Sequence, residues 1–182
     1  RQADSQNVAV RLGRGLDTAN AAIADRIAED LNLEGMGCTV VGVWMVADQL
    51  GFISVGDSPL WCLRASGFDR LNEDHSMAGL MEEAGDDLSD PASRLAYTKA
   101  RNMLRSSVQG EAIDLVDRRD RIAMAAGDMI VLASDGILTL DVDEIASLAE
   151  SLAGRDSETV AATLIGAVVA RDNPRQDNAT II

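Results

Sequence analysis

Apolar side chains recur at intervals of three and four near the start of the chain. From Leu16 to Leu31, the residues Leu16, Ile23 and Ile27 fall on one helical face, and charged residues occupy positions between them. This pattern predicts an amphipathic helix. We expect the helix to stop before Gly35, because glycine disfavours a helical backbone.

Short apolar runs separated by turn residues follow this helix. Enrichment in valine, threonine and tryptophan favours strands over helices in such runs. The predicted strands are Cys38–Val46, Leu50–Val55, Leu60–Arg64 and Phe68–Leu71. Because Gly56-Asp57-Ser58-Pro59 and Ser66-Gly67 are typical turn sequences, we expect these four strands to form one antiparallel meander.

Beyond Ala78 the pattern alternates between helical and extended segments. Pro91, preceded by Ser89-Asp90, suits the first position of a helix that runs to about Leu104. The later predicted elements are two weak strands within Ile113–Met124, a strand at Met129–Ala133, helices at Asp143–Leu152 and Ser157–Ala170 with Ser157 as N-cap, and a strand at Asn178–Ile182. With no repeat or long linker, residues 1–182 are expected to form a single domain of mixed α and β structure.

The composition limits both the core and the membrane behaviour of the chain. Of its 182 residues 47% are hydrophobic but only 3% are aromatic, so the core must consist mainly of aliphatic side chains. The longest apolar stretch, around Ala161–Ala170, is about half of the ~20 residues that a membrane-spanning helix requires. The sequence therefore predicts no membrane insertion.

The charge balance is strongly acidic. Thirty aspartate and glutamate residues face sixteen lysine and arginine residues, which gives a formal net charge of −14. This balance argues against nucleic acid and against anionic membrane surfaces as partners. The carboxylates either lie on solvated faces, as most do in most proteins, or converge in small number on a cation.

The two cysteines, Cys38 and Cys62, both fall in apolar strand-like segments. Neither belongs to a Cys-x-x-Cys motif or to a zinc-binding spacing. We expect two buried thiols and, because cysteines are few, a reducing compartment such as the cytoplasm; a disulfide between them is the alternative.

Three aspartates stand beside glycine, asparagine or histidine at the ends of predicted strands. They are Asp74, Asp135 and Asp177. Carboxylate oxygens suit hard cations such as Mg²⁺ or Mn²⁺, whereas the shortage of histidine and cysteine argues against zinc. Taken singly, each aspartate fits a turn as well as a metal ligand.

No nucleophilic catalytic set accompanies these aspartates. The sequence contains neither a convincing Ser/His/Asp combination nor a cysteine-phosphatase or Walker loop. The single histidine, His75, has no nucleophile to pair with, so we interpret it as a loop or capping residue rather than a general acid.

Five short segments occur in order along nearly the whole chain, and together they resemble the type 2C (PPM) family of metal-dependent protein phosphatases. They are Gly35-Met36-Gly37-Cys38-Thr39, Val55-Gly56-Asp57-Ser58, Asn72-Glu73-Asp74-His75-Ser76, Gly127-Asp128 with Leu132-Ala133-Ser134-Asp135-Gly136-Ile137, and Gln176-Asp177-Asn178-Ala179-Thr180-Ile181. Each motif is short, but five of them in register form a specific pattern.

The resemblance implies a fold and a metal site. The implied fold is α+β, a four-layer α-β-β-α sandwich with two antiparallel sheets. By the same resemblance Asp135 and Asp177 are ligands of a paired metal site, and Asp74 helps to hold a third, more weakly bound ion. Gly136, Asn178 and Asp57 are expected to shape the loops around these ligands.

The resemblance also implies an activity. A pair of Mg²⁺ or Mn²⁺ ions, with a third in some members, would activate a water that hydrolyses phosphoserine or phosphothreonine on a protein substrate. The acidic stretch Leu80–Arg101 corresponds to a variable flap that could select partners, or is simply a solvated helix pair. The alternative function is a non-catalytic regulatory or interaction domain; the oligomeric state is left open.

Two motifs of the family have no counterpart in the sequence. These are an Arg/Asn-Gln-Asp segment and an Asp-Gly-Met-Gly-Gly segment that precede the first long helix of the family. Arg1–Asn7 contains Asp4 and Gln6 but does not reproduce the first of them. We therefore expect the chain to be a piece of a phosphatase without its N-terminal metal-binding strands, rather than a natural form that has lost catalysis.

Overall fold

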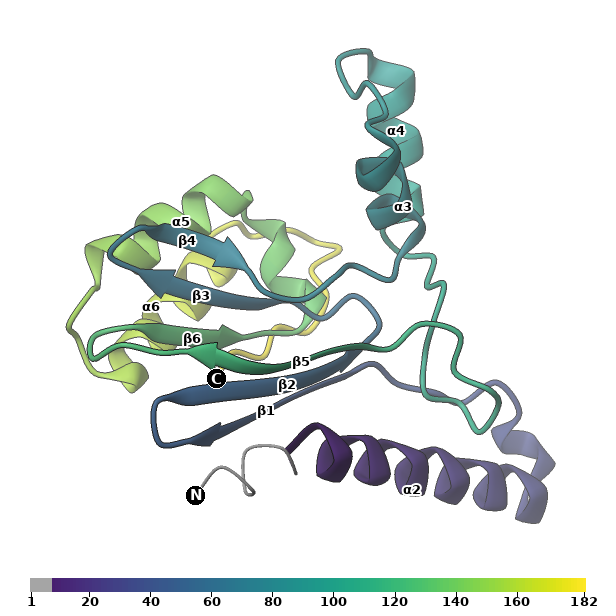
Figure 1. The fold of residues 1–182 in the computed structure, drawn as a ribbon. Helices are drawn as coiled ribbons and strands as arrows, with labels where there is room; N and C mark the ends of the chain where they lie inside the picture. Colours follow the sequence, from purple (N-terminus) through teal and green to yellow (C-terminus); the bar gives the residue numbers. More distant parts are fainter. Residues whose placement is uncertain (1–7) are drawn as a thin grey trace. The chain divides into compact units, whose positions relative to one another are not determined.

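The computed structural model describes residues 8–182, so Asp4 and Gln6 lie outside the described residues. The chain divides into two compact units (Figure 1). The first comprises residues up to Asp57 together with Glu73–Ala123, and the second comprises Ser58–Asn72 and Met124–Ile182. Each unit contains one three-stranded antiparallel sheet.

The sheet of the first unit has the order β1-β2-β5. Its strands are β1 (Val40–Val46), β2 (Gln49–Val55) and β5 (Asp117–Ala123). Val40 pairs with Val55 at one end of the β1–β2 hairpin, and Ser54 pairs with Asp117 across β2 and β5. The central strand β2 is almost entirely buried, as expected of a strand with neighbours on both edges.

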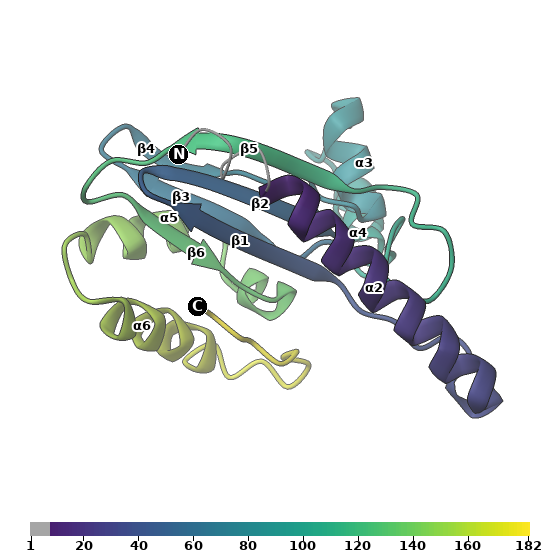
Figure 2. The same ribbon diagram turned by 60° about the horizontal axis from the view of Figure 1, so that its bottom comes forward.

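The helix α2 (Val8–Glu29) lies across one face of this sheet (Figure 2). Its apolar stripe packs Leu16 against Ile53, Val55 and Val108 in a small buried cluster. The predicted amphipathic helix is confirmed, but α2 begins eight residues earlier than Leu16 and gives way to a short 3-10 turn, η1 (Leu31–Leu33), before Gly35.

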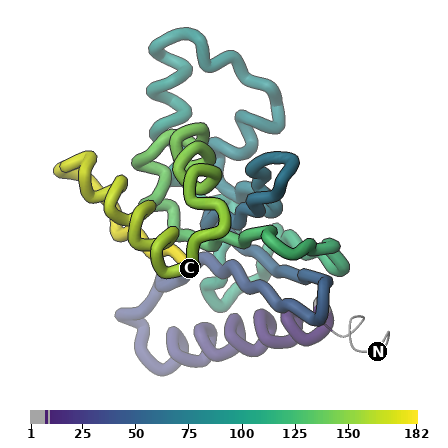
Figure 3. Tube along the Cα trace, turned by 90° about the vertical axis from the view of Figure 1, so that its left-hand side faces the viewer, coloured from purple at the N-terminus to yellow at the C-terminus, as the bar shows by residue number. Residues whose placement is uncertain are grey.

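Two short helices follow Asp74 in the first unit. They are α3 (Met77–Ala84) and α4 (Pro91–Ala100), and the chain runs out along the first and returns along the second (Figures 1 and 3). Ser76 caps α3, a helix that was not predicted. Asp90 caps α4, and Pro91 stands at its first position as predicted. The expected extension to Leu104 is wrong, because the helix ends at Ala100 and Leu104 forms a β-bridge to Ser76.

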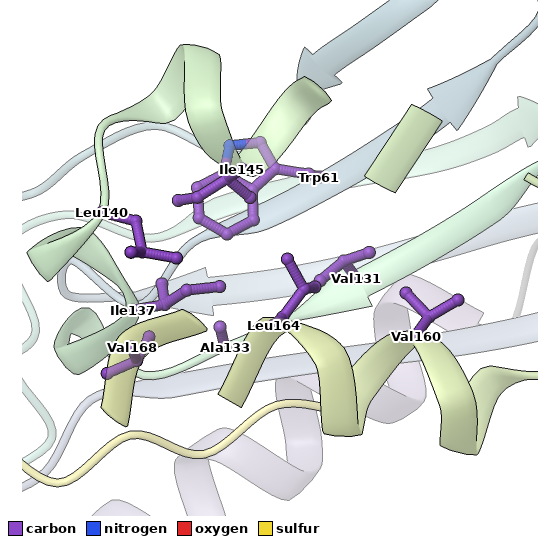
Figure 4. Packing of buried hydrophobic residues seen from close by; sticks show 9 residues of the cluster. All are labelled: Trp61, Val131, Ala133, Ile137, Leu140, Ile145, Val160, Leu164 and Val168. Atoms are coloured by element: carbon purple, nitrogen blue, oxygen red, sulfur yellow. The ribbon is translucent and has the colours of Figure 1, made fainter. Parts of the chain in front are cut away.

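The sheet of the second unit has the order β4-β3-β6. Its elements are β3 (Leu60–Arg64), β4 (Gly67–Arg70), β6 (Met129–Leu132), the 3-10 helix η2 (Asp135–Thr139), and the helices α5 (Val142–Ser151) and α6 (Ser157–Val169). Ile145 of α5 and Leu164 of α6 pack on Trp61 and Val131 in a continuous apolar core (Figure 4). This core has one large aromatic, Trp61, whose ring centroid lies 5.5 Å from that of Phe68.

The predicted four-stranded meander is wrong, although all four strands exist. Both edges of β2 are occupied by β1 and β5, so β3 cannot pair with it and instead pairs with β4 and β6. The chain therefore changes sheets at Gly56, whose φ of +100° and close approach to Thr39 only glycine accommodates.

Several smaller predictions also need correction. Ile113–Met124 contains one strand, β5, rather than two, and Asn178–Ile182 forms only an isolated bridge between Ile181 and Ala133. The N-cap of α6 is Asp156 rather than Ser157. The Asp156 carboxylate accepts a hydrogen bond from the Thr159 amide. Cys62 is a buried free thiol as expected, whereas Cys38 is exposed.

The predicted α+β class with two antiparallel sheets is confirmed. In each unit helices cover a face of the sheet, α2 in the first and α5 with α6 in the second. Among residues 8–182, none of the helices combines the length and the hydropathy needed to cross a bilayer.

Candidate functional site

Asp135 stands directly beyond the end of β6. Leu132 is the last residue of the strand, Ala133 forms a bridge to Ile181, and Asp135 opens η2. Ile137, two residues further on, is completely buried in the core of the second unit. This anchor fixes the turn, and the half-buried Asp135 is held at its start.

The loop that carries Asp177 packs directly against this turn. A Cβ atom added at Gly136 would lie 2.5 Å from the carbonyl oxygen of Asn178, so only glycine allows the approach. The hydroxyl of Ser134 donates to the same Asn178 oxygen at 3.0 Å and accepts from the Thr180 amide at 3.0 Å. The backbones on both sides of Asp135 are therefore in contact with the segment that follows Asp177.

The side chain of Gln176 joins the two loops a second time. Its amide nitrogen Nε2 donates to the Gly136 carbonyl at 3.0 Å and to the Asp177 carbonyl at 2.7 Å. Its amide oxygen Oε1 is buried and has no hydrogen-bond partner. The exposed Asp177 carboxylate accepts from the Asn178 amide at 2.7 Å, which orients it within its own loop.

The structure thus brings the Asp135 turn and the Asp177 loop together within one unit, through Gly136, Ser134 and Gln176. Carboxylates on neighbouring loops at a strand end can share a hard cation. Within residues 8–182, no group of three or more histidine, cysteine, aspartate or glutamate side chains is arranged to hold a metal ion.

Asp74 belongs to the other unit and precedes α3. Its Oδ1 accepts from the Ser76 amide at 2.9 Å, and the neighbouring Glu73 amide donates to Asp117 at 2.9 Å. Gly79 of α3 packs on the Asp74 backbone so closely that an added Cβ would lie 2.2 Å from the Asp74 carbonyl oxygen. Asp74 is half-buried and is held by contacts on both of its sides.

The neighbouring His75 is buried, with 2% of its surface exposed. Its ring nitrogen Nδ1 accepts from the Gly56 amide at 3.2 Å, and its own amide donates to the Gly56 carbonyl at 3.2 Å. Burial lowers the pKa of the imidazole, against the opposing charges of Glu73 and Asp117. A neutral ring whose Nδ1 accepts a hydrogen bond suits the predicted role of His75 in shaping a loop.

Asp57 lies in the turn that His75 holds, and it is 8% exposed. The turn begins at Gly56, where an added Cβ would lie 2.3 Å from Cγ2 of Thr39. Asp57 therefore lies where the chain changes sheets, and its loop-shaping role stays a prediction.

The sequence pointed to the aspartates but missed the side chains that hold their loops together. Ser134 and Gln176 both lie inside motifs that the sequence analysis quoted, yet neither residue type signals a role there. The only available signal was their position next to Asp135 and Asp177.

No protein-family model matches the chain. Similar proteins nevertheless exist. The serine/threonine protein phosphatase PstP of Mycobacterium tuberculosis is 25% identical over 174 residues, which cover 94% of this chain and 32% of PstP. The chain thus spans about a third of the length of this curated relative.

Solved structures of bacterial phosphatases match most of the chain. The serine/threonine phosphatase of S. agalactiae has 26% identity and a TM-score of 0.75, over 91% of this chain and 65% of that one. Stp1 of Staphylococcus aureus has 20% identity and a TM-score of 0.79, over 97% and 66% respectively. The catalytic domain of PstP was crystallised with two manganese ions. It has 24% identity and a TM-score of 0.71, over 89% of this chain and 64% of that one.

Motif order, two antiparallel sheets and these similarities agree with one another. The chain is similar in sequence to bacterial serine/threonine phosphatases and has the fold of the solved phosphatase chains, of whose length it covers about two thirds.

Proposed function

We propose that the protein containing this chain hydrolyses phosphoserine and phosphothreonine in proteins, with Mg²⁺ or Mn²⁺ as cofactor. The observation that carries the proposal is the contact between the Asp135 turn and the Asp177 loop, made possible by Gly136. The names of the relatives and the two manganese ions in the PstP catalytic domain support it.

The residues of the second unit fit a hydrated divalent cation. Asp135 and Asp177 offer carboxylate oxygens, the donors that Mg²⁺ and Mn²⁺ prefer. A bound ion pair would supply an activated water and would screen the charge of the phosphate.

In this proposal the residues of the chain bind the metal ions and orient the loops that carry the metal ligands. Asp135 and Asp177 would hold the paired ions, while Ser134 and Asn178 fix the loops on which these aspartates stand. Asp74, which is itself held by Ser76 and Gly79, would help to hold a third ion. Asp57 shapes the turn at Gly56 and takes no part in chemistry.

The finer assignments are also proposals. A phosphorylated protein as substrate is supported by the names of the relatives, and the net charge of −14 disfavours nucleic acid. A cytoplasmic location is supported by two free cysteines, Cys38 and Cys62, in a chain without disulfides among its described residues. Residues 1–182 are proposed to belong to one phosphatase domain.

The test is phosphatase activity of the whole protein with Mn²⁺, measured on p-nitrophenyl phosphate and on a phosphothreonine peptide. Asp135→Ala should lower kcat/KM by more than about 100-fold, since even indirect partners of a metal contribute 10- to 100-fold. The control is Asp143→Ala, an exposed aspartate in the first turn of α5, which should leave activity unchanged. A folded wild-type protein without activity on either substrate would favour the non-catalytic regulatory domain instead.

A further inference from the structure

Gln176 occupies an unusual position between the two aspartate loops. Its side chain reaches across to the turn of Asp135 through the Gly136 carbonyl, and it also binds the carbonyl of the next residue, Asp177. A single amide group therefore contacts both loops at their closest approach.

The orientation of this amide is determined by its neighbours. Two carbonyl oxygens lie 3.0 Å and 2.7 Å from Nε2, and a carbonyl can only accept a hydrogen bond. Exchanging the nitrogen and the oxygen would place three oxygens in contact with one another. The acceptor Oε1 must therefore point away from both carbonyls.

The oxygen Oε1 is buried and has no hydrogen-bond partner in the protein. Buried and unpaired amide oxygens are rare in native proteins, because leaving such an atom without a donor is unfavourable. The two carbonyls on the other side of the amide are satisfied, so Oε1 alone still requires a donor.

We propose that Gln176 is a positioning residue of the metal site, an inference that rests on the proposed function. Its Nε2 holds the Asp135 turn and the Asp177 loop at a fixed separation, which sets the spacing of the two carboxylates that would bind the divalent cations. Outer partners of this kind orient metal ligands without touching the metal.

The experiment measures Mn²⁺ binding to the whole protein by isothermal titration calorimetry, together with the melting temperature of the metal-free protein. Gln176→Met keeps the length and approximate volume of the side chain but removes both hydrogen-bonding functions. We expect the Kd for Mn²⁺ to rise about 10- to 100-fold. Gln176→Asn keeps the amide but shortens the reach, and it should weaken binding similarly.

Gln109→Met is the matched control. Gln109 is exposed, and its amide oxygen accepts a hydrogen bond from the Ser107 hydroxyl, so its replacement should leave the Kd within about twofold of wild type. This variant separates a specific effect from the general effect of replacing glutamine by methionine.

The outcomes separate this inference from the proposed function. A wild-type protein that binds Mn²⁺ while Gln176→Met and Gln176→Asn bind it equally well would overturn the inference and leave the function standing. A melting temperature that falls in the metal-free variants with an unchanged Kd, or variants that fail to fold, would make Gln176 purely structural and would also overturn it. A wild-type protein that binds no Mn²⁺ would overturn both.

Discussion

The segment around Asp74 and the pair of loops around Asp135 and Asp177 are held in different ways. The Asp74 segment is fixed by many separate hydrogen bonds, to Gly56, Arg105 and Asp117 among others. The Asp135 turn meets the Asp177 loop through one close backbone approach at Gly136 and two polar side chains, Ser134 and Gln176.

The two regions should therefore respond differently to substitution. Several hydrogen bonds hold the Asp74 segment, so the loss of one of them should weaken the segment without separating its parts. Each region contains a glycine whose added Cβ would collide with backbone, but Gly79 meets Asp74 within one continuous segment, whereas Gly136 meets Asn178 of a separate loop that few other contacts join to it. The second region should therefore be the more sensitive of the two.

The largest expected effect is that of Gly136→Ala. The added Cβ, 2.5 Å from the Asn178 oxygen, must push the Asp177 loop away from Asp135. Overpacking of this kind costs about 1–3 kcal/mol of unfolding free energy. We expect Mn²⁺ affinity to fall by more than about 10-fold, as measured by calorimetry on the whole protein.

Gly166→Ala provides the control for this substitution. Gly166 lies in α6, where an added Cβ meets nothing within 4 Å, so alanine should stabilise the helix by about 0.5–1 kcal/mol. Unchanged Mn²⁺ affinity in Gly136→Ala, measured beside this control, would contradict the interpretation that Gly136 sets the distance between the two loops.

A smaller effect is expected at His75. His75→Leu removes the acceptor for the Gly56 amide, and an unpaired buried amide costs about 1–3 kcal/mol in urea unfolding. His75→Asn should lower the free energy of unfolding by less, since the asparagine side-chain oxygen can approach the position of Nδ1. Equal losses in the two variants would show that the ring's packing, rather than its hydrogen bond, holds the Gly56 turn.

The smallest expected effect concerns the α3–α4 hairpin that continues from Asp74. The Tyr97 hydroxyl donates to the Glu82 carboxylate, and burial together with that carboxylate raises the pKa of Tyr97 to about 12. Because the folded pKa lies above the unfolded value of about 10, the contribution to stability is complete below pH 10 and is lost as the pH rises to 12.

Urea unfolding between pH 9 and 12, followed by circular dichroism, tests this expectation. Wild type should lose stability over that interval more steeply than Tyr97→Phe, by less than about 1 kcal/mol, because water screens the exposed Glu82. Parallel curves for the two proteins would mean that the hydroxyl contributes nothing to the pairing of α3 and α4.

Most helices and strands could be predicted from the sequence, because their periodicity is local. The strand Leu60–Arg64 and the start of the helix at Pro91 agree with the structure to the residue. Strand partners could not be predicted in this way. The choice of β3 to pair with β6 rather than β2 depends on which edges are already occupied, and β5 lies more than sixty residues after β2 in the chain.

For the candidate site, the sequence identified the aspartates but not the contacts between their loops. Asp135 and Asp177 stood out because carboxylates beside glycine and asparagine at strand ends suit a hard cation. Nothing in the sequence indicated that Gln176 would span two carbonyls or that His75 would accept from the Gly56 amide. Both depend on residues that come together only after folding.

Most of the elements, the aliphatic character of the core and the candidate aspartates follow from the sequence alone, since each depends on residue type and local spacing. The division of the strands between two sheets and the contact of Gly136 with Asn178 emerge only in the folded chain. The physical reason is that strand pairing and close backbone contact join residues far apart in the chain, and such contacts are selected by the packing of whole elements rather than by any local pattern.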